Sequence, residues 1–134
     1  MEETIQRVEA LRNEQRYNCA QVVATMLMED AGQNGALLAQ ALRGFGGGLT
    51  CGKICGCVTG GAAGLNALVE ADGTEGKRAC GLMNKQLATW FEQRFGSTEC
   101  VALKSTENGH TPVPCNQLIA ETYLQCAQMR RQRG

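Results

Sequence analysis

Apolar residues recur at spacings of three and four along most of the chain, which is the pattern of amphipathic α-helices. Residues 2–14 form the first such stretch. A second begins after Asn18, a residue type favoured at helix N-caps, and Gly32 interrupts it. A short helix is expected over residues 36–42, and no stretch alternates as a β-strand would. The pattern therefore predicts an all-α fold, a small bundle of about five to six helices.

A glycine-rich loop, residues 44–48, is expected to lead into a central helix over residues 50–71. Glycines recur in this helix every four residues and would share one face, at Gly52, Gly56, Gly60 and Gly64. Each glycine costs about 1 kcal/mol relative to alanine inside a helix. The glycine face therefore indicates close approach of another backbone or of a bulky group.

The longest amphipathic stretch covers residues 78–95 and predicts a helix that buries Leu82, Leu87 and Phe91. Gly96 is expected to end this helix. Ser97 is expected to cap a short helix that ends at residue 103. Pro114 has the residue type that opens helices and predicts the start of the last one.

The composition indicates a single globular domain over residues 1–134, because 43% of the residues are apolar and 19% are charged. Basic and acidic residues balance at 13 each, which gives no electrostatic argument for binding nucleic acid. The longest uncharged stretch, residues 54–69, is too short for a membrane span. The charged N-terminal helix does not resemble a signal peptide, so a cytoplasmic location is expected. A homodimer would cover the remaining apolar faces of so small a bundle.

The chain contains eight cysteines, and in the cytosol cysteines more often bind metal or perform redox chemistry than form structural disulfides. Two of them, Cys80 and Cys126, lie inside predicted helices and are interpreted as small buried apolar residues. Four others lie close to predicted helix starts, where free N–H groups favour a thiolate over a thiol. These four are Cys19, Cys55, Cys100 and Cys115.

The densest cluster contains Cys51, Cys55 and Cys57. On one helix Cys51 and Cys55 would share a face and Cys57 would point the other way, so one ion could not bind all three unless the helix begins after Cys55. Core packing is the favoured interpretation of Cys57. The chain has no Cys-x-x-Cys motif, which argues against thioredoxin-like, zinc-ribbon and ferredoxin-type sites.

The order and spacing of these cysteines resemble those of the C_GCAxxG_C_C family of small redox-active proteins from anaerobic bacteria and archaea. The resemblance covers residues 17–123 and rests on Tyr17-Asn18-Cys19-Ala20-Gln21, Gly46-Gly47-Gly48, Cys55-Gly56-Cys57-Val58-Thr59-Gly60, Phe95-Gly96-Ser97, Cys100 and Cys115. It aligns the family cysteines with Cys19, Cys55, Cys100 and Cys115. This chain departs from the family by carrying Cys57 at the alanine position and by adding Cys51. A related domain occurs in the split-Soret cytochrome, where it resembles an iron–sulfur carrier, so the resemblance implies electron transfer or thiol redox chemistry.

Three functions remain open from the sequence. The first is an iron–sulfur redox protein with Cys19, Cys55, Cys100 and Cys115 as ligands, Cys51 or Cys57 as additional ones, and a redox protein as its partner. The second is a metal-free dithiol protein in which Cys55 is the low-pKa nucleophile and Cys19 or Cys100 resolves the disulfide. The third is a helical interaction domain with structural zinc. Four similar cysteines exceed the two that a dithiol needs, which favours the cluster; no enzyme class is assigned.

Overall fold

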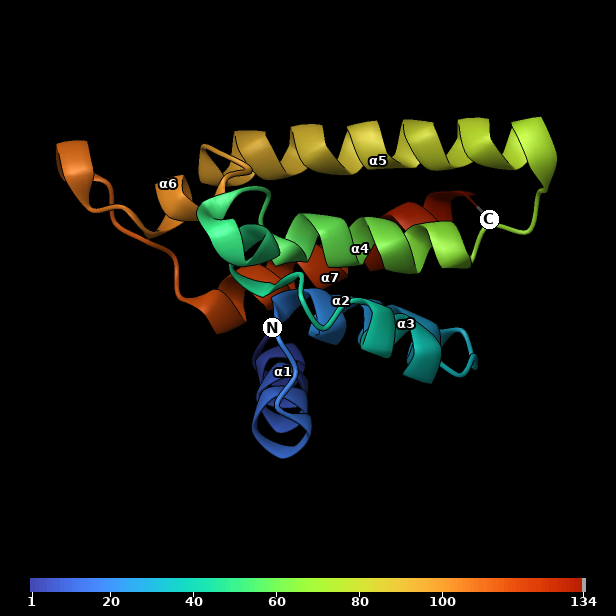
Figure 1. Ribbon diagram of the computed structural model, residues 1–134, viewed down its shortest axis with the longest axis horizontal. Helices are drawn as coiled ribbons and strands as arrows, with labels where there is room; N and C mark the ends of the chain where they lie inside the picture. Colours follow the sequence, from blue (N-terminus) through green and yellow to red (C-terminus); the bar gives the residue numbers. More distant parts are fainter. Residues whose placement is uncertain (134) are drawn as a thin grey trace.

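The computed structural model describes residues 1–133 and is built from α-helices joined by short loops (Figure 1). The all-α prediction is confirmed, because no strand occurs within the described residues. One isolated antiparallel bridge joins Ile54 and Glu99. In chain order the elements are α1 (Glu2–Gln15), α2 (Cys19–Asp30), α3 (Ala36–Ala41), the turn η1 (Gly48–Gly52), α4 (Gly56–Ala67), α5 (Gly73–Phe95), α6 (Cys100–Lys104), the turn η2 (Glu107–Gly109) and α7 (Cys115–Arg133).

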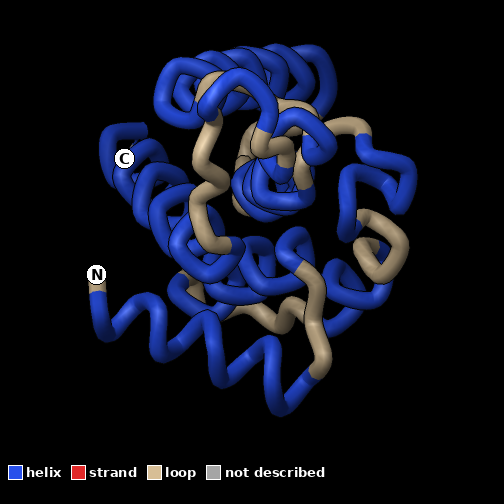
Figure 2. Tube along the Cα trace, turned by 90° about the vertical axis from the view of Figure 1, so that its left-hand side faces the viewer, coloured by secondary structure: helices blue, strands red, loops and turns tan. Residues whose placement is uncertain are grey.

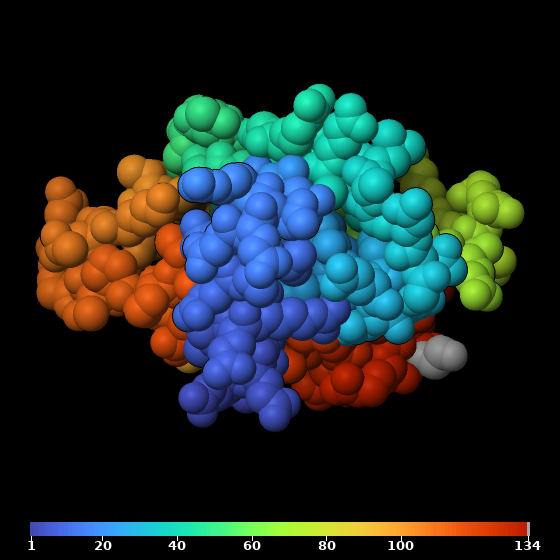
Figure 3. Space-filling model, turned by 90° about the horizontal axis from the view of Figure 1, so that it is seen from below, coloured from blue at the N-terminus to red at the C-terminus, as the bar shows by residue number. Residues whose placement is uncertain are grey.

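Helix α4 lies at the centre of the bundle, with α5 alongside it and α2 and α7 on its other sides (Figures 1 and 2). Helix α1 crosses the outside of the bundle and packs against α7 (Figure 3). The core between these helices includes Leu27, Leu65, Leu87, Phe91 and Ile119, all of them fully buried. Of the helices described, none is long and apolar enough to cross a membrane.

The central helix is shorter than the sequence predicts, and the expectation of a helix over residues 50–71 is wrong at both ends. Helix α4 begins at Gly56 and ends at Ala67. Before it, Leu49, Thr50 and Gly52 adopt left-handed backbone angles, with φ of 59°, 64° and 77°, and Lys53 has a non-helical ψ of −140°. A right-handed helix cannot pass through such residues, so the chain makes a tight turn there instead.

The remaining glycines of the predicted face do bring α4 close to α2. A methyl group added at Gly60 would lie 2.5 Å from the Cα atom of Ala20, and one added at Gly64 would lie 3.3 Å from the Cα atom of Ala24. Only a glycine permits such an approach between two helix backbones. The predicted close packing is therefore present, although Gly52 takes no part in it.

Three other details of the second half differ from expectation. Helix α5 begins at Gly73, five residues before its predicted start, and Leu82 on it is 64% exposed and not in the core. Glu99, not Ser97, occupies the N-cap position of α6. The Ser97 hydroxyl instead accepts a hydrogen bond from the Glu99 N–H at 3.0 Å, which stabilises the turn before the helix. Gly96 ends α5 with a φ of 92°, as predicted.

Cys126 is fully buried in α7, and burial raises its pKa to about 12. In an unfolded chain a cysteine ionises with a pKa of about 8.5. Because the pKa is higher in the folded state, the associated stability is complete below about pH 8.5 and is lost as the pH rises toward the folded pKa. We expect the free energy of unfolding of the wild type to fall more steeply over this alkaline range than that of Cys126→Ala, measured by urea denaturation under reducing conditions. Parallel pH dependences would contradict the assignment.

Candidate functional site

Five cysteines from four segments of the chain line one cavity of about 120 Å³, here called the cysteine cavity. It lies at the end of the molecule where α4, α6 and α7 begin (Figure 1). Its lining residues are Arg12, Asn18, Cys19, Gly46, Gly47, Cys55, Cys57, Cys100, Leu103, Lys104, Val113, Cys115 and Leu118. The structure thus brings together all four cysteines that the sequence singles out, and adds Cys57.

The helix starts account for the positions of four of these cysteines. Cys19, Cys100 and Cys115 are the first residues of α2, α6 and α7, and Cys55 is the N-cap residue of α4. The placement at helix starts is therefore confirmed. Cys55, Cys57 and Cys100 are buried, Cys19 is half-buried and Cys115 is exposed. The cavity consequently runs from a buried floor to the surface at Cys115.

Backbone hydrogen bonds fix two of the cysteines relative to each other. The Cys55 N–H donates to the Thr98 carbonyl, and the Cys100 N–H donates to the Lys53 carbonyl, both at 2.7 Å. These two bonds flank the Ile54–Glu99 bridge. The starts of α4 and α6 are thereby held side by side across more than 40 residues of intervening chain.

Asn18 anchors the third helix start and also lines the cavity. Its side-chain oxygen accepts from the Gln21 N–H at 2.9 Å, and the Gln21 side chain accepts from the Asn18 N–H at 3.0 Å, which completes the predicted cap as a capping box. The Asn18 amide nitrogen donates to the carbonyls of Leu42 and Arg43 at 3.1 and 3.0 Å. The one side chain therefore ties α2, and with it Cys19, to the segment that precedes the glycine loop.

Asn18→Ala is expected to lower the free energy of unfolding by about 2 kcal/mol, since it removes a helix cap and leaves two carbonyls without their donor. Asn18→Ser keeps a cap acceptor without adding a charge, but its shorter side chain cannot reach the carbonyls of Leu42 and Arg43, so its loss is expected to be smaller. Thermal unfolding of the three proteins measures the difference. Equal stability of Asn18→Ala and the wild type would show that the capping box contributes nothing.

Gly56, the first residue of α4, makes room for a cavity cysteine. A methyl group on Gly56 would lie 2.5 Å from the Cys19 sulfur and 3.1 Å from the Ala20 nitrogen. Any side chain there would displace the sulfur from its position beside Cys55 and Cys57. Glycine at this position is therefore required by the site as well as by helix packing.

The thiols of Cys19, Cys55 and Cys57 share hydrogen bonds. Donation from Cys55 and then from Cys57, together with the N–H groups of Ala20 and Gly47, holds the pKa of Cys19 far below its usual range. Donation to Cys19 and burial raise the pKa of Cys55 and that of Cys57. The directions of these shifts favour Cys19 as the most acidic of the three thiols, whereas the sequence analysis expects Cys55 in that role.

The two cysteines next to Cys55 in sequence have different surroundings. Because α4 begins only after Cys55, Cys57 turns toward Cys19 and Cys55; it is 1% exposed and lines the cavity. Core packing alone does not describe it. Cys51 is exposed, and its sulfur lies 3.6 Å from the Gly48 carbonyl and outside the cavity lining. Cys80 is half-buried inside α5, away from the cavity.

Two basic residues that the sequence analysis does not identify also line the cavity, Arg12 from α1 and Lys104 from the end of α6. Their positions depend on how α1 packs and where α6 ends, and no motif marks them. Of the described residues, no Asp or Glu lines this cavity.

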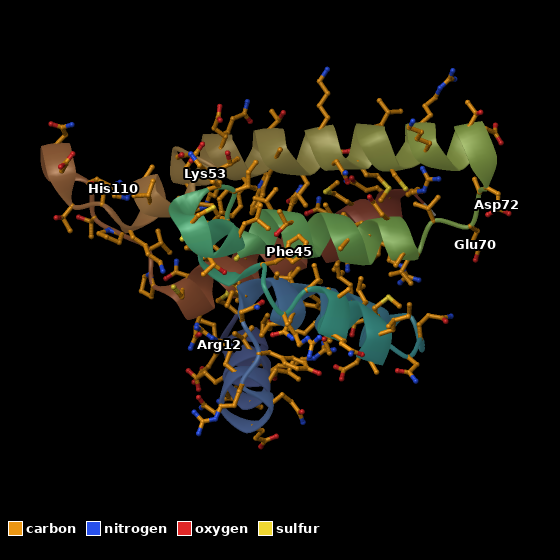
Figure 4. The ribbon with its side chains drawn as sticks, in the orientation of Figure 1. Arg12, Phe45, Lys53, Glu70, Asp72 and His110 are labelled. Atoms are coloured by element: carbon orange, nitrogen blue, oxygen red, sulfur yellow. The ribbon has the colours of Figure 1, made fainter. Side chains whose placement is uncertain are left out.

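The donor chemistry of the cavity fits a soft metal or an iron–sulfur cluster, since all of its ligating side chains are thiols. Within residues 1–133, however, no group of three or more His, Cys, Asp or Glu side chains is arranged to hold a single metal ion. The side chains that surround the cavity end are drawn in Figure 4.

No curated protein and no solved structure shows a significant match to the chain. A family model does match residues 17–129, and its description reads "Putative redox-active protein (C_GCAxxG_C_C)". The Gly-Cys-Ala-x-x-Gly part of that pattern fits Gly56-Cys57-Val58-Thr59-Gly60-Gly61, with valine in place of alanine. This alignment puts Cys57 at the motif cysteine in place of Cys55, and both line the cavity. Because the match covers most of its length, the chain belongs to the C_GCAxxG_C_C family of redox-active proteins.

Proposed function

We propose that this protein is an electron-transfer protein whose redox centre, an iron–sulfur cluster, is held by thiolates in the cysteine cavity. The observation that carries the proposal is the convergence of five cysteines on one cavity, four of them at helix starts. Two thiols would suffice for dithiol chemistry, whereas clusters take about four thiolates. The ligands are drawn from Cys19, Cys55, Cys57, Cys100 and Cys115.

The surroundings of the sulfurs support this chemistry. Free N–H groups at a helix start favour negative charge on sulfur, and hydrogen bonds to sulfur tune the potential of a cluster. When bound, a cluster supplies one-electron transfer. The exposed Cys115 brings the cavity to the surface, where a redox partner protein can exchange electrons with it.

A cluster suits this arrangement better than structural zinc. A zinc ion draws four ligands onto one tetrahedral centre, and no three potential ligands among the described residues are arranged to hold one ion. In a cluster the thiolates bind different iron atoms, so they need not converge on a single point.

A second candidate is a metal-free dithiol protein, favoured by the hydrogen bonds among Cys19, Cys55 and Cys57. The Cys19 thiolate would attack a substrate disulfide, break its S–S bond and release one substrate thiolate, which takes a proton from solvent. Cys55 or Cys57 would then attack the mixed disulfide, form the protein disulfide and release the second substrate thiol, so that the protein passes two electrons and one proton to the substrate.

Anaerobic purification of the protein without added metal separates these functions. The cluster proposal predicts a brown protein with visible absorbance and with iron and acid-labile sulfide in equal amounts. A colourless protein that lacks iron and forms one reversible intramolecular disulfide would refute the cluster and support the dithiol function. Stoichiometric zinc without redox activity would refute both.

A further inference from the structure

Arg12 is held at the cysteine cavity by a defined contact. Its Nη1 donates to the Asn116 side-chain oxygen at 2.8 Å, one residue after Cys115, and the side chain is half-buried (Figure 4). Helix α1, which carries it, precedes the region that matches the family model. The cation is therefore fixed at the rim of the cavity and is not a freely moving surface charge.

A second group of contacts, made by Arg7 nearer the N-terminal end of α1, fixes the orientation of this helix. Arg7 forms ion pairs with Glu29 and Asp30 of α2, both at 3.0 Å, and lies over the ring of Tyr123 in α7. These contacts join α1 to two other helices, one of which also carries Cys115. The position of Arg12 is thus a consequence of how the whole helix docks.

Lys104, the last residue of α6, lines the same cavity, and no acidic residue among those described lines it with these two cations. The chain as a whole has equal numbers of acidic and basic residues. Two cationic side chains without a carboxylate are therefore a local feature of this cavity, and cations beside a low-dielectric cleft raise the local concentration of anions.

We propose that Arg12 and Lys104 make the cysteine cavity selective for a small anionic redox reactant. The inference rests on the proposed redox function, and it specifies the sign of the charge on the molecule that exchanges electrons with the cavity. The proposed redox centre occupies the cavity of about 120 Å³, so the anion meets the two cations at the cavity mouth and does not need to enter. The two cations attract it to the cavity mouth and leave the electron transfer itself to the sulfur centre.

The test compares two small oxidants of opposite charge, ferricyanide and a cationic cobalt(III) complex, with the anaerobically reduced full-length protein. In each reaction the protein centre loses one electron and the oxidant gains it. The double variant Arg12→Gln/Lys104→Gln is expected to lower the anion-to-cation rate ratio by about tenfold at low salt, and the difference should shrink at high salt. The single variant Arg12→Lys keeps both positive charges, because Lys104 is unchanged, and is expected to retain the anion-to-cation rate ratio of the wild type.

The matched control is Arg78→Gln/Lys85→Gln, which removes the same charge from exposed positions of α5 outside the cavity. An unchanged ratio in the cavity variant, or an equal fall in the control, would overturn the selectivity while leaving the redox function intact. Failure of the wild type to react with either oxidant would refute the proposed function and this inference together.

Discussion

Gly60→Ala is expected to destabilise the protein by about 3 kcal/mol, because the added methyl group would overlap the backbone of Ala20 where α2 and α4 meet. Neither helix can shift without disturbing core residues on its far side. For a chain of this size the loss corresponds to a fall of about 10 °C in the midpoint of thermal unfolding. Calorimetry or circular dichroism measures it directly.

Close packing of α2 on α4 and helix propensity predict changes of opposite sign in the stability of Gly60→Ala. Helix propensity alone predicts that alanine is better than glycine by about 1 kcal/mol. Gly81 in α5 provides the matched control, because a methyl group there meets no atom within 4 Å. Gly81→Ala is therefore expected to leave stability unchanged or to raise it slightly. Stabilisation by both substitutions would contradict the close packing of α2 on α4.

Serine substitution of the cavity cysteines is expected to have the largest functional effect. Loss of a thiolate ligand should remove most of the bound iron from the Cys19, Cys100 and Cys115 variants, measured as iron per chain after anaerobic purification. Cys80→Ser is the control, since this residue lies within α5 outside the cavity. It should retain the iron content of the wild type.

The same series resolves the role of the two neighbouring cysteines. The family pattern favours Cys57 as the motif ligand, whereas the spacing in the sequence favours Cys55. Because the motif cysteine falls at Cys57, Cys57→Ser is expected to lose iron, and Cys55→Ser and Cys51→Ser are expected to keep it. Retention of iron in all the cavity variants would refute the ligand assignment.

Much of the fold was predictable because it depends on local signals. The Asn18 cap, the glycine end of α5 and the start of α7 after Pro114 are each determined by residues within one helical turn. The positions of Cys19 and Cys115 at helix starts follow directly from two of these signals. The convergence of those helix starts on one cavity depends on tertiary packing and could not be derived from them.

Two of the errors, the start of the central helix and the interpretation of Cys57, share a physical origin in the segment before α4. The four-residue glycine period includes Gly52 and therefore predicts that the helix starts before it, but Gly52 has a left-handed φ of 77° and Lys53 a non-helical ψ of −140°. A helix that continued through this segment would put Cys57 on the opposite face from Cys55. The correct helix start brings both to the cavity, and Arg12 joins them only through the docking of α1.

A potentiometric titration of the anaerobically purified protein tests most directly whether the cysteine cavity is a redox centre. One reversible transition is expected in the wild type and in Cys80→Ser, and Cys57→Ser is expected to lose it while retaining the helical circular dichroism spectrum. A reversible transition of unchanged potential and amplitude in Cys57→Ser, Cys19→Ser and Cys115→Ser would contradict it.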